Sequence, residues 1–278
     1  MSSNNGVELN PPDFVYPKKM VMMFREKGLR PTGRREVAGL RDIDHALANL
    51  VARSLSGLFV TTETVHNKSL ARFLERPPQD QVLIGHFEDL RDMVRSIRQA
   101  RAGRKSQQGN KFANLDALPI VNLTRTLDLS YGYTERQLDR ADYATLVDDA
   151  GSVQYLLSTL PITLSYNLTV AAADKEPLAI LCNAMANHFY FLHDTGFLAT
   201  TSLCGIPVEA ECALNNMKGF MVSDVSLPVS EERLFAGQMT IDVIADGLMA
   251  IEVESYTSRV QVGVQVREEH RAFADKDA

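Results

Sequence analysis

The sequence predicts a mixed α+β fold, with a twisted, mostly antiparallel sheet packed by two or three amphipathic helices. Two long stretches, residues 121–131 and 161–171, alternate between apolar and polar side chains. Successive side chains of a strand point to opposite faces, so each stretch would have one buried face and one polar face. Both are long for strands. A helical pattern follows the second stretch directly, which indicates a sheet covered by helices on one side.

The two alternating stretches justify the central strands. In residues 121–131 the odd positions carry the apolar set, which consists of Val121, Leu123, Leu127, Leu129 and Tyr131. In residues 161–171 the even positions carry it, as Ile162, Leu164, Tyr166, Leu168 and Val170. Residues 132–158 between them have no such period and predict a polar loop excursion, and loops of that length are usually functional or disordered.

Three segments have helical spacing. Residues 42–59 place apolar side chains on one face, with Asp42 as a fair N-cap and Gly57 as a plausible stop. Residues 80–102 carry a second apolar stripe, formed by Leu83, Phe87, Leu90, Val94 and Ile97. The third helix begins at Asp174 or Glu176, since Pro177 suits a first turn, and buries a stripe through Phe189.

The last third of the chain is rich in predicted strands. Residues 206–214 alternate, and so do residues 239–245 before Asp246-Gly247, a dipeptide typical of hairpin turns. The chain is therefore expected to return through residues 248–253. Residues 260–266 place valine at every second position, opposite Arg259, Gln261 and Gln265.

Length and composition predict one large domain with appendages. We expect an extended N-terminal arm at residues 1–41, an α+β domain at residues 42–267 and a charged tail at residues 268–278. The N-terminus has neither the basic start nor the apolar core of a signal peptide, and no run of 18 apolar residues predicts a membrane span. Three widely spaced cysteines do not suggest a disulfide framework, so we expect assembly in a reducing cytoplasm.

Motifs that carry chemistry are not found in the sequence. The metal candidates lack ligand spacing, and they are His188, His193, Asp194, Cys204 and Cys212. No Gly-x-Ser-x-Gly elbow occurs. Residues 103–109 are basic and flanked by glycine, but they follow a predicted helix and lack the Gly-Lys-Ser ending of a phosphate loop. The sequence therefore predicts no enzyme, no cofactor and no metal site.

Two segments are candidate partner interfaces. The first is an apolar patch in the N-terminal arm, formed by Met22, Met23 and Phe24, which suits an adaptable contact on a neighbouring subunit or belongs to a plain tail. The second is basic: residues 91–111 carry seven Lys or Arg and one Asp, a local charge of +6 that leaves −12 for the rest of the chain. Its candidate contacts are Arg95, Arg98, Arg101, Arg104 and Lys105. A solvated face, docking to an acidic protein partner and contact with nucleic acid all remain open, although the net charge of −6 does not favour nucleic acid or a membrane.

Three sequence blocks, taken in order, carry a family resemblance over residues 42–255. The first is the early helix ending Leu55-Ser-Gly-Leu58-Phe59. The second is Leu118-Pro119, followed by Asn122-Leu123 and Asp128-Leu129-Ser130-Tyr131. The third runs from Leu160-Pro161-Ile162 through Tyr166 and an acidic turn to a helix ending in aromatics at residues 189–191. In this order the chain resembles the tail-completion proteins of contractile-tailed phages, also called tail-sheath stabilisers or tail terminators.

The resemblance implies a structural virion protein without a cofactor. Such a protein forms a ring, expected to be a hexamer, at the head-proximal end of the tail. It ends the tube and sheath and joins them to the neck, so the implied partners are further copies of itself, sheath or tube subunits and a neck connector protein. DNA would meet it only in passing through the lumen. The family has an extended segment where this chain has the predicted basic helix at residues 80–102, and the N-terminal arm has no counterpart in it.

Other functions remain open on the sequence alone. A different structural ring, either a neck adaptor or a baseplate component, would share the same features. A nucleic-acid-binding protein would use the basic stretch and bind less tightly as salt rises. A small-molecule enzyme of unknown type is the remaining class.

Overall fold

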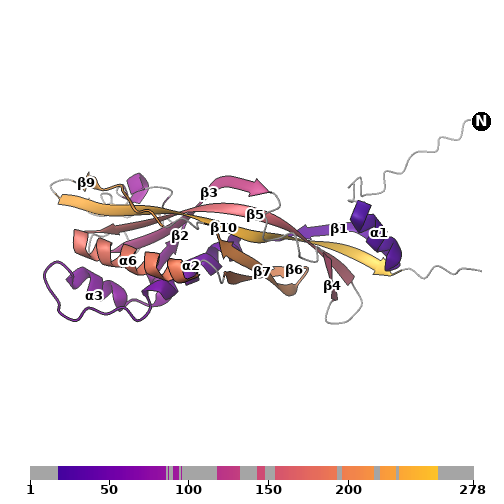
Figure 1. Ribbon diagram of the computed structural model, residues 1–278, viewed down its shortest axis with the longest axis horizontal. Coiled ribbons are helices and arrows are strands. Elements are labelled where there is room, and N and C mark those ends of the chain that lie inside the picture. Colours follow the sequence, from indigo (N-terminus) through magenta and orange to yellow (C-terminus); the bar gives the residue numbers. More distant parts are fainter. Residues whose placement is uncertain are drawn as a thin grey trace, which may run out of the picture. The chain divides into compact units, whose positions relative to one another are not determined.

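The computed structural model describes residues 18–85, 87, 90–93, 95, 118–131, 143–147, 154–192, 196–215, 220–229 and 232–255 (Figure 1). The chain forms two compact units. One comprises residues 1–33 with 253–278, and the other comprises residues 34–252. In the first unit, the helix α1 (Lys18–Glu26) precedes the start of β1 (Leu29–Val37), and Phe24 and Leu29 are buried.

A ten-stranded sheet of the described residues organises the fold, in the order β2-β3-β5-β10-β7-β6. Its strands are β2 (Val82–Ile84), β3 (Ile120–Tyr131), β5 (Gln154–Ala172), β10 (Glu232–Ser255), β7 (Ile206–Leu214) and β6 (Phe197–Leu203). Four shorter or lateral strands lie off this path: β4 (Tyr143–Val147) pairs with β5, and β1, β8 (Ser223–Asp224) and β9 (Leu227–Val229) pair with β10. The described registers are antiparallel except that of β2 with β3, so the mixed α+β class is confirmed.

Helices α2 (Arg41–Leu55) and α6 (Lys175–Leu192) pack against each other and against the sheet (Figure 1). The even positions of β5 predicted to be apolar are all buried in the same cluster as the helix stripes. Leu47, Val51 and Leu55 of α2 recur every four residues, and so do Leu181, Met185 and Phe189 of α6. This spacing puts each set on one helix face, and each such side chain stabilises the fold by roughly 1.5–3 kcal/mol on burial.

A second, smaller cluster contains alternate residues of the same strands. Ala171 of β5 and Ile120 of β3 belong to it, with Leu234 and Ala236 of β10. It also holds Leu83, Phe87, Leu90, Met93 and Leu118. Because neighbouring positions of β5 belong to different clusters, the sheet is covered on both faces at this end rather than on one side only.

The predicted helix at residues 80–102 is wrong at its beginning. Helix α3 (Lys68–Leu74) and a short helix, α4 (Pro78–Gln81), are followed by β2, which pairs in parallel with residues 121–123 of β3. Val82 belongs to the main hydrophobic cluster and Leu83 to a second one, so successive side chains alternate between two clusters as they do in a strand. Pairing with the sheet therefore outweighs the helical pattern of this segment. Residues 90–93 and 95 are helical, and residues 96–117 lie outside the described part.

The predicted turn at Asp246-Gly247 is also wrong, because β10 continues through it without a break. A Cβ atom on Gly247 would lie 3.0 Å from the Leu160 carbonyl oxygen and 3.2 Å from Ile162 Cγ2. The glycine therefore permits close approach of β5 instead of forming a turn.

Two other segments differ from the expected loops and arms. Residues 143–147 form β4 and residues 154–158 begin β5, so part of the predicted excursion at 132–158 is sheet, although residues 132–142 and 148–153 lie outside the described part. Residues 18–26 of the predicted extended arm are helical, and β1 joins the sheet at β10. The predicted strand at 260–266 and the tail at 268–278 lie outside the described residues.

Candidate functional site

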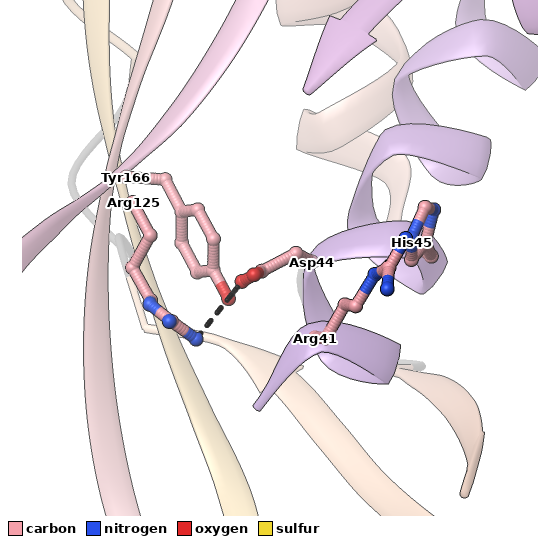
Figure 2. Close-up of polar contacts among 5 residues, drawn as sticks. All are labelled: Arg41, Asp44, His45, Arg125 and Tyr166. Carbon is pink, nitrogen blue, oxygen red and sulfur yellow. Dashed lines mark hydrogen bonds and ion pairs between the residues drawn. The ribbon is translucent and has the colours of Figure 1, made fainter. Parts of the chain in front are cut away.

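A partly buried polar junction connects helix α2 to two central strands of the sheet. The Tyr166 hydroxyl of β5 donates a hydrogen bond to Asp44 Oδ1 at 2.9 Å, and Arg125 Nη1 of β3 contacts the same oxygen at 3.2 Å. Figure 2 shows both side chains pointing from the strands toward Asp44, while Arg41 and His45 lie together elsewhere on α2. One carboxylate therefore joins three elements that are far apart in sequence.

The surroundings of this junction perturb its titration. Burial raises the pKa of Asp44, and the hydrogen bond from Tyr166 and the charge of Arg125 offset part of that rise. Burial is also the main reason that the pKa of Tyr166 lies well above its ordinary value, with the charge of Asp44 as the second cause. Tyr166 therefore stays protonated and acts as a hydrogen-bond donor, which is a structural role.

The strand register explains why Arg125 reaches the junction. Arg125 lies directly opposite Tyr166 in the antiparallel ladder, so both side chains project from the same face of the sheet. Arg125 occupies an odd position of residues 121–131, where the sequence pattern places apolar residues. A charge in the apolar phase of a strand needs a buried partner. This was the signal available in the sequence, and it was missed.

A groove of about 630 Å³ lies between α2 and β6, and none of the three junction residues lines it. Helix α2 lines it with residues at helical spacing, which are Asp42, His45, Ala46, Asn49, Leu50 and Arg53. The opposite wall consists of Leu192, Gly196, Phe197, Leu198 and Thr200. Asp42 Oδ2 also accepts a hydrogen bond from Thr201 Oγ1 at 2.6 Å, which fixes the helix against β6. Polar and apolar residues both line the groove.

Within the described ranges, no group of three or more His, Cys, Asp or Glu side chains is placed to hold a metal ion. Of the metal candidates, Cys212 is buried and His188 and Cys204 are partly buried, whereas His193 and Asp194 lie outside the described residues. No described helix is long and apolar enough to cross a membrane.

Comparison with known proteins assigns no family. No protein-family model matches this chain, and no curated protein matches it in sequence.

The predicted partner residues fall in different surroundings. On α1, Met22 is 60% exposed whereas Phe24 is buried, and the side chain of Met23 lies outside the described part. Arg95 is exposed and forms an ion pair with Asp92 at 2.9 Å. The remaining basic candidates lie outside the described residues, and they are Arg98, Arg101, Arg104 and Lys105. Of the predicted partner residues, only Met22, Phe24 and Arg95 therefore have described side chains.

Two exposed apolar patches were not predicted. The register of β3 with β5 shifts between Arg125 and Leu129, so Leu127 lies inside an irregular segment of the ladder. Leu127 is 99% exposed, and Leu129 and Tyr131 are exposed as well, although they lie opposite the apolar residues Leu164 and Ile162 of β5. At the end of α6, Tyr190 and Phe191 are exposed with their rings 5.9 Å apart. Exposed apolar patches mark interaction surfaces more often than single exposed side chains do.

Proposed function

We propose that this chain is a structural virion protein that forms a ring at the head-proximal end of a contractile phage tail. The ring ends the tube and sheath and joins them to the neck. The observation that carries the proposal is the ordered set of three sequence blocks that resemble tail-completion proteins.

The fold is consistent with those blocks belonging together. They occupy α2, β3, and β5 with α6, and these elements pack around one core. The Asp44 junction connects the same elements, since its three residues come from α2, β3 and β5. The blocks therefore form one folding unit rather than three unrelated likenesses.

The exposed patches provide surfaces on which such a protein would meet its partners. A ring interface is heterologous, because one surface of a subunit meets a different surface of the next. The β3 patch at Leu127, Leu129 and Tyr131 and the α6 patch at Tyr190 and Phe191 are separate apolar surfaces of the same unit. A ring with distinct faces requires surfaces of this kind.

The decisive experiment is genetic complementation of a phage that lacks this protein, with electron microscopy of its tails. Overlong tails or unstable sheaths support the proposal, whereas complete tails without heads indicate a neck adaptor. A purified chain that stays strictly monomeric and never enters tails refutes it. A six-membered ring would weigh roughly 185 kDa, six times the chain mass of 30.9 kDa.

A variant pair connects this test to the surface. Tyr190→Ser with Phe191→Ser removes the α6 patch, and we expect tails complemented by this variant to remain defective. Val65→Ser is the matched control, because Val65 is 91% exposed in a loop away from either patch. Equal rescue by both variants excludes the α6 patch as a tail contact.

A further inference from the structure

Strand β6 offers an open edge for the addition of another strand. It is the last strand in the sheet order, and among the described strands it pairs only with β7. A two-residue loop, Cys204-Gly205, joins the two strands, and both loop residues have positive φ, at 52° and 77°. In a hairpin with a two-residue loop, the two residues that flank the loop, here Leu203 and Ile206, are hydrogen bonded to each other, and every second residue of each strand from there is bonded across the pair. The backbone groups of Leu198, Thr200 and Ser202 therefore point away from β7, toward the open edge.

Helix α2 lies beside this edge, and an added strand could pack its side chains against it. Leu198 and Thr200 line the groove from the strand side, and Ala46 and Leu50 line it from the helix. Every second side chain of an added strand would point into the groove, toward Ala46, Leu50 and Phe197. The other side chains would point outward beside Leu198, which is 55% exposed. A groove between an edge strand and a helix suits an extended peptide whose apolar and polar side chains alternate.

We propose that residues 259–267 of one copy add as a strand to the open edge of β6 in a second copy. These residues lie outside the described part, so the inference uses their sequence alone. Val260, Val262, Val264 and Val266 alternate with polar residues or glycine over seven residues, and β6 is also seven residues long. The segment follows the end of β10 at Ser255, with 23 residues remaining to the C-terminus. At about 3.3 Å per residue, that length is enough to reach a neighbouring copy.

Charge favours this occupant as well. With the valines over α2, Arg259 and Arg267 face outward at the two ends of the added strand. Glu209 and Glu211 are exposed on β7, directly opposite Thr200 and Leu198. The added strand lies two strand spacings, about 10 Å, from β7, so its two arginines and the two carboxylates of β7 share one face of the sheet and attract each other over a longer distance than an ion pair. Donor segment and acceptor groove differ, so the contact is heterologous and repeats from copy to copy.

The test is the solution mass of full-length variants, measured by light scattering. Val262→Asp with Val264→Asp blocks the donor, and Gln261→Ser with Gln265→Ser is its control, because it changes the outward face without adding negative charge beside Glu209 and Glu211. Thr200→Pro blocks the acceptor by removing an outward N–H, which an edge strand tolerates. Thr200→Val is the control that keeps this N–H. We expect the wild type and both controls to assemble, and both blocked variants to have the mass of one chain, 30.9 kDa.

Mixing the two blocked variants distinguishes strand exchange between copies from a simple loss of folding. One variant still has a donor and the other an acceptor, so together they should form a species of two chains, twice the mass of either alone. Formation of this pair also shows that neither variant is unfolded. As a second measurement, a synthetic peptide of residues 256–268 should dissociate the wild-type assembly, while the same peptide with both aspartates should not.

Three results would overturn the inference: a wild type at the mass of one chain, a blocked variant that stays assembled, or a mixture that stays at the mass of one chain. The last would mean that the segment folds back on its own copy or binds nowhere. The strand-exchange inference and the proposed tail function can fail independently, because a chain that exchanges strands but does not enter phage tails would support the first and refute the second.

Discussion

Replacing Asp44 by alanine tests whether one carboxylate holds the helix and the two central strands together. The substitution removes the acceptor for the Tyr166 hydroxyl, at 2.9 Å, and the ion-pair partner of Arg125, at 3.2 Å. Tyr166 is fully buried, with 0% of its surface exposed. The Tyr166 hydroxyl therefore cannot turn to bulk solvent without disturbing the core around it, whereas the partly exposed Arg125 can.

The expected cost follows from the burial of the partners. A buried hydroxyl left without an acceptor costs about 1–3 kcal/mol. Breaking a fully buried ion pair costs about 3–5 kcal/mol, but the Arg125 side chain is 30% exposed and that of Asp44 is 15% exposed, which reduces this contribution. Relief of the burial that raises the pKa of Asp44 offsets a further part. We therefore expect Asp44→Ala to lower the free energy of unfolding by about 3 kcal/mol.

Urea denaturation measures this change. With a slope of about 3 kcal/mol/M, at the upper end for small proteins, the midpoint should fall by about 1 M at an unchanged slope. His66→Ala is the control, because His66 and Asp174 form an exposed pair at 3.4 Å that should contribute less than about 1 kcal/mol. A double-mutant cycle with Tyr166→Phe should give a coupling energy of at least about 1 kcal/mol. A coupling energy near zero would refute the junction, since the two groups would then act independently.

Three further predictions concern single residues. Gly196 has φ +66°, and a Cβ atom there would lie 2.5 Å from the Cys212 carbonyl oxygen, so Gly196→Ala should lower the free energy of unfolding by at least about 2 kcal/mol. Gly57→Ala is the control and should cost about 1 kcal/mol, because a Cβ atom there meets no other atom; equal shifts in melting temperature would contradict the clash. Burial and the carboxylate of Glu36 raise the pKa of the Cys204 thiol to about 11, so Glu36→Gln should speed alkylation of this thiol several-fold at pH 9. Alkylation of Cys182, whose pKa is raised by burial alone, should stay slow. An unchanged rate at Cys204 would show that Glu36 does not raise its pKa. Burial lowers the pKa of His188 below 6.5, so as the pH falls the unfolded state binds the proton first and the folded state loses stability. His188→Gln should make the urea midpoint depend less on pH below 6.5. A pH profile identical to that of the wild type would show that His188 does not contribute.

Local periodicity was enough to predict the elements that pack on one face. Residues 42–59 and the segment after Asp174 became α2 and α6, and the alternating stretches became β3 and β5, because each has an apolar set at the spacing of its own structure. The mixed α+β class followed from these four elements alone.

Periodicity failed where a residue serves a contact that is distant in sequence. Gly247 was interpreted as a turn residue, but its missing side chain makes room for Leu160 on β5. Leu127 and Leu129 were expected on the buried face, but both are exposed: Leu127 lies within the register shift after Arg125, and Leu129 is 40% exposed although it pairs with Leu164. The hydrogen bond between Tyr166 and Asp44 spans 122 residues. Pairing at such separations depends on the assembled sheet, and no window of the sequence contains it.

The edges of the sheet differ in how they prevent unwanted pairing. On one side β2 has only three residues, and β3 beyond it carries Arg125, Asp128 and a register shift. Short strands, charges and bulges are the devices that protect an edge. On the other side β6 has seven residues with neither a charge nor a proline. Protecting one edge while leaving the other bare is a costly arrangement for a chain that stays alone, because an unprotected edge promotes aggregation. It is the expected arrangement for a chain whose β6 edge is covered on assembly, and it favours β6 over β3 as the place where the next copy adds its strand.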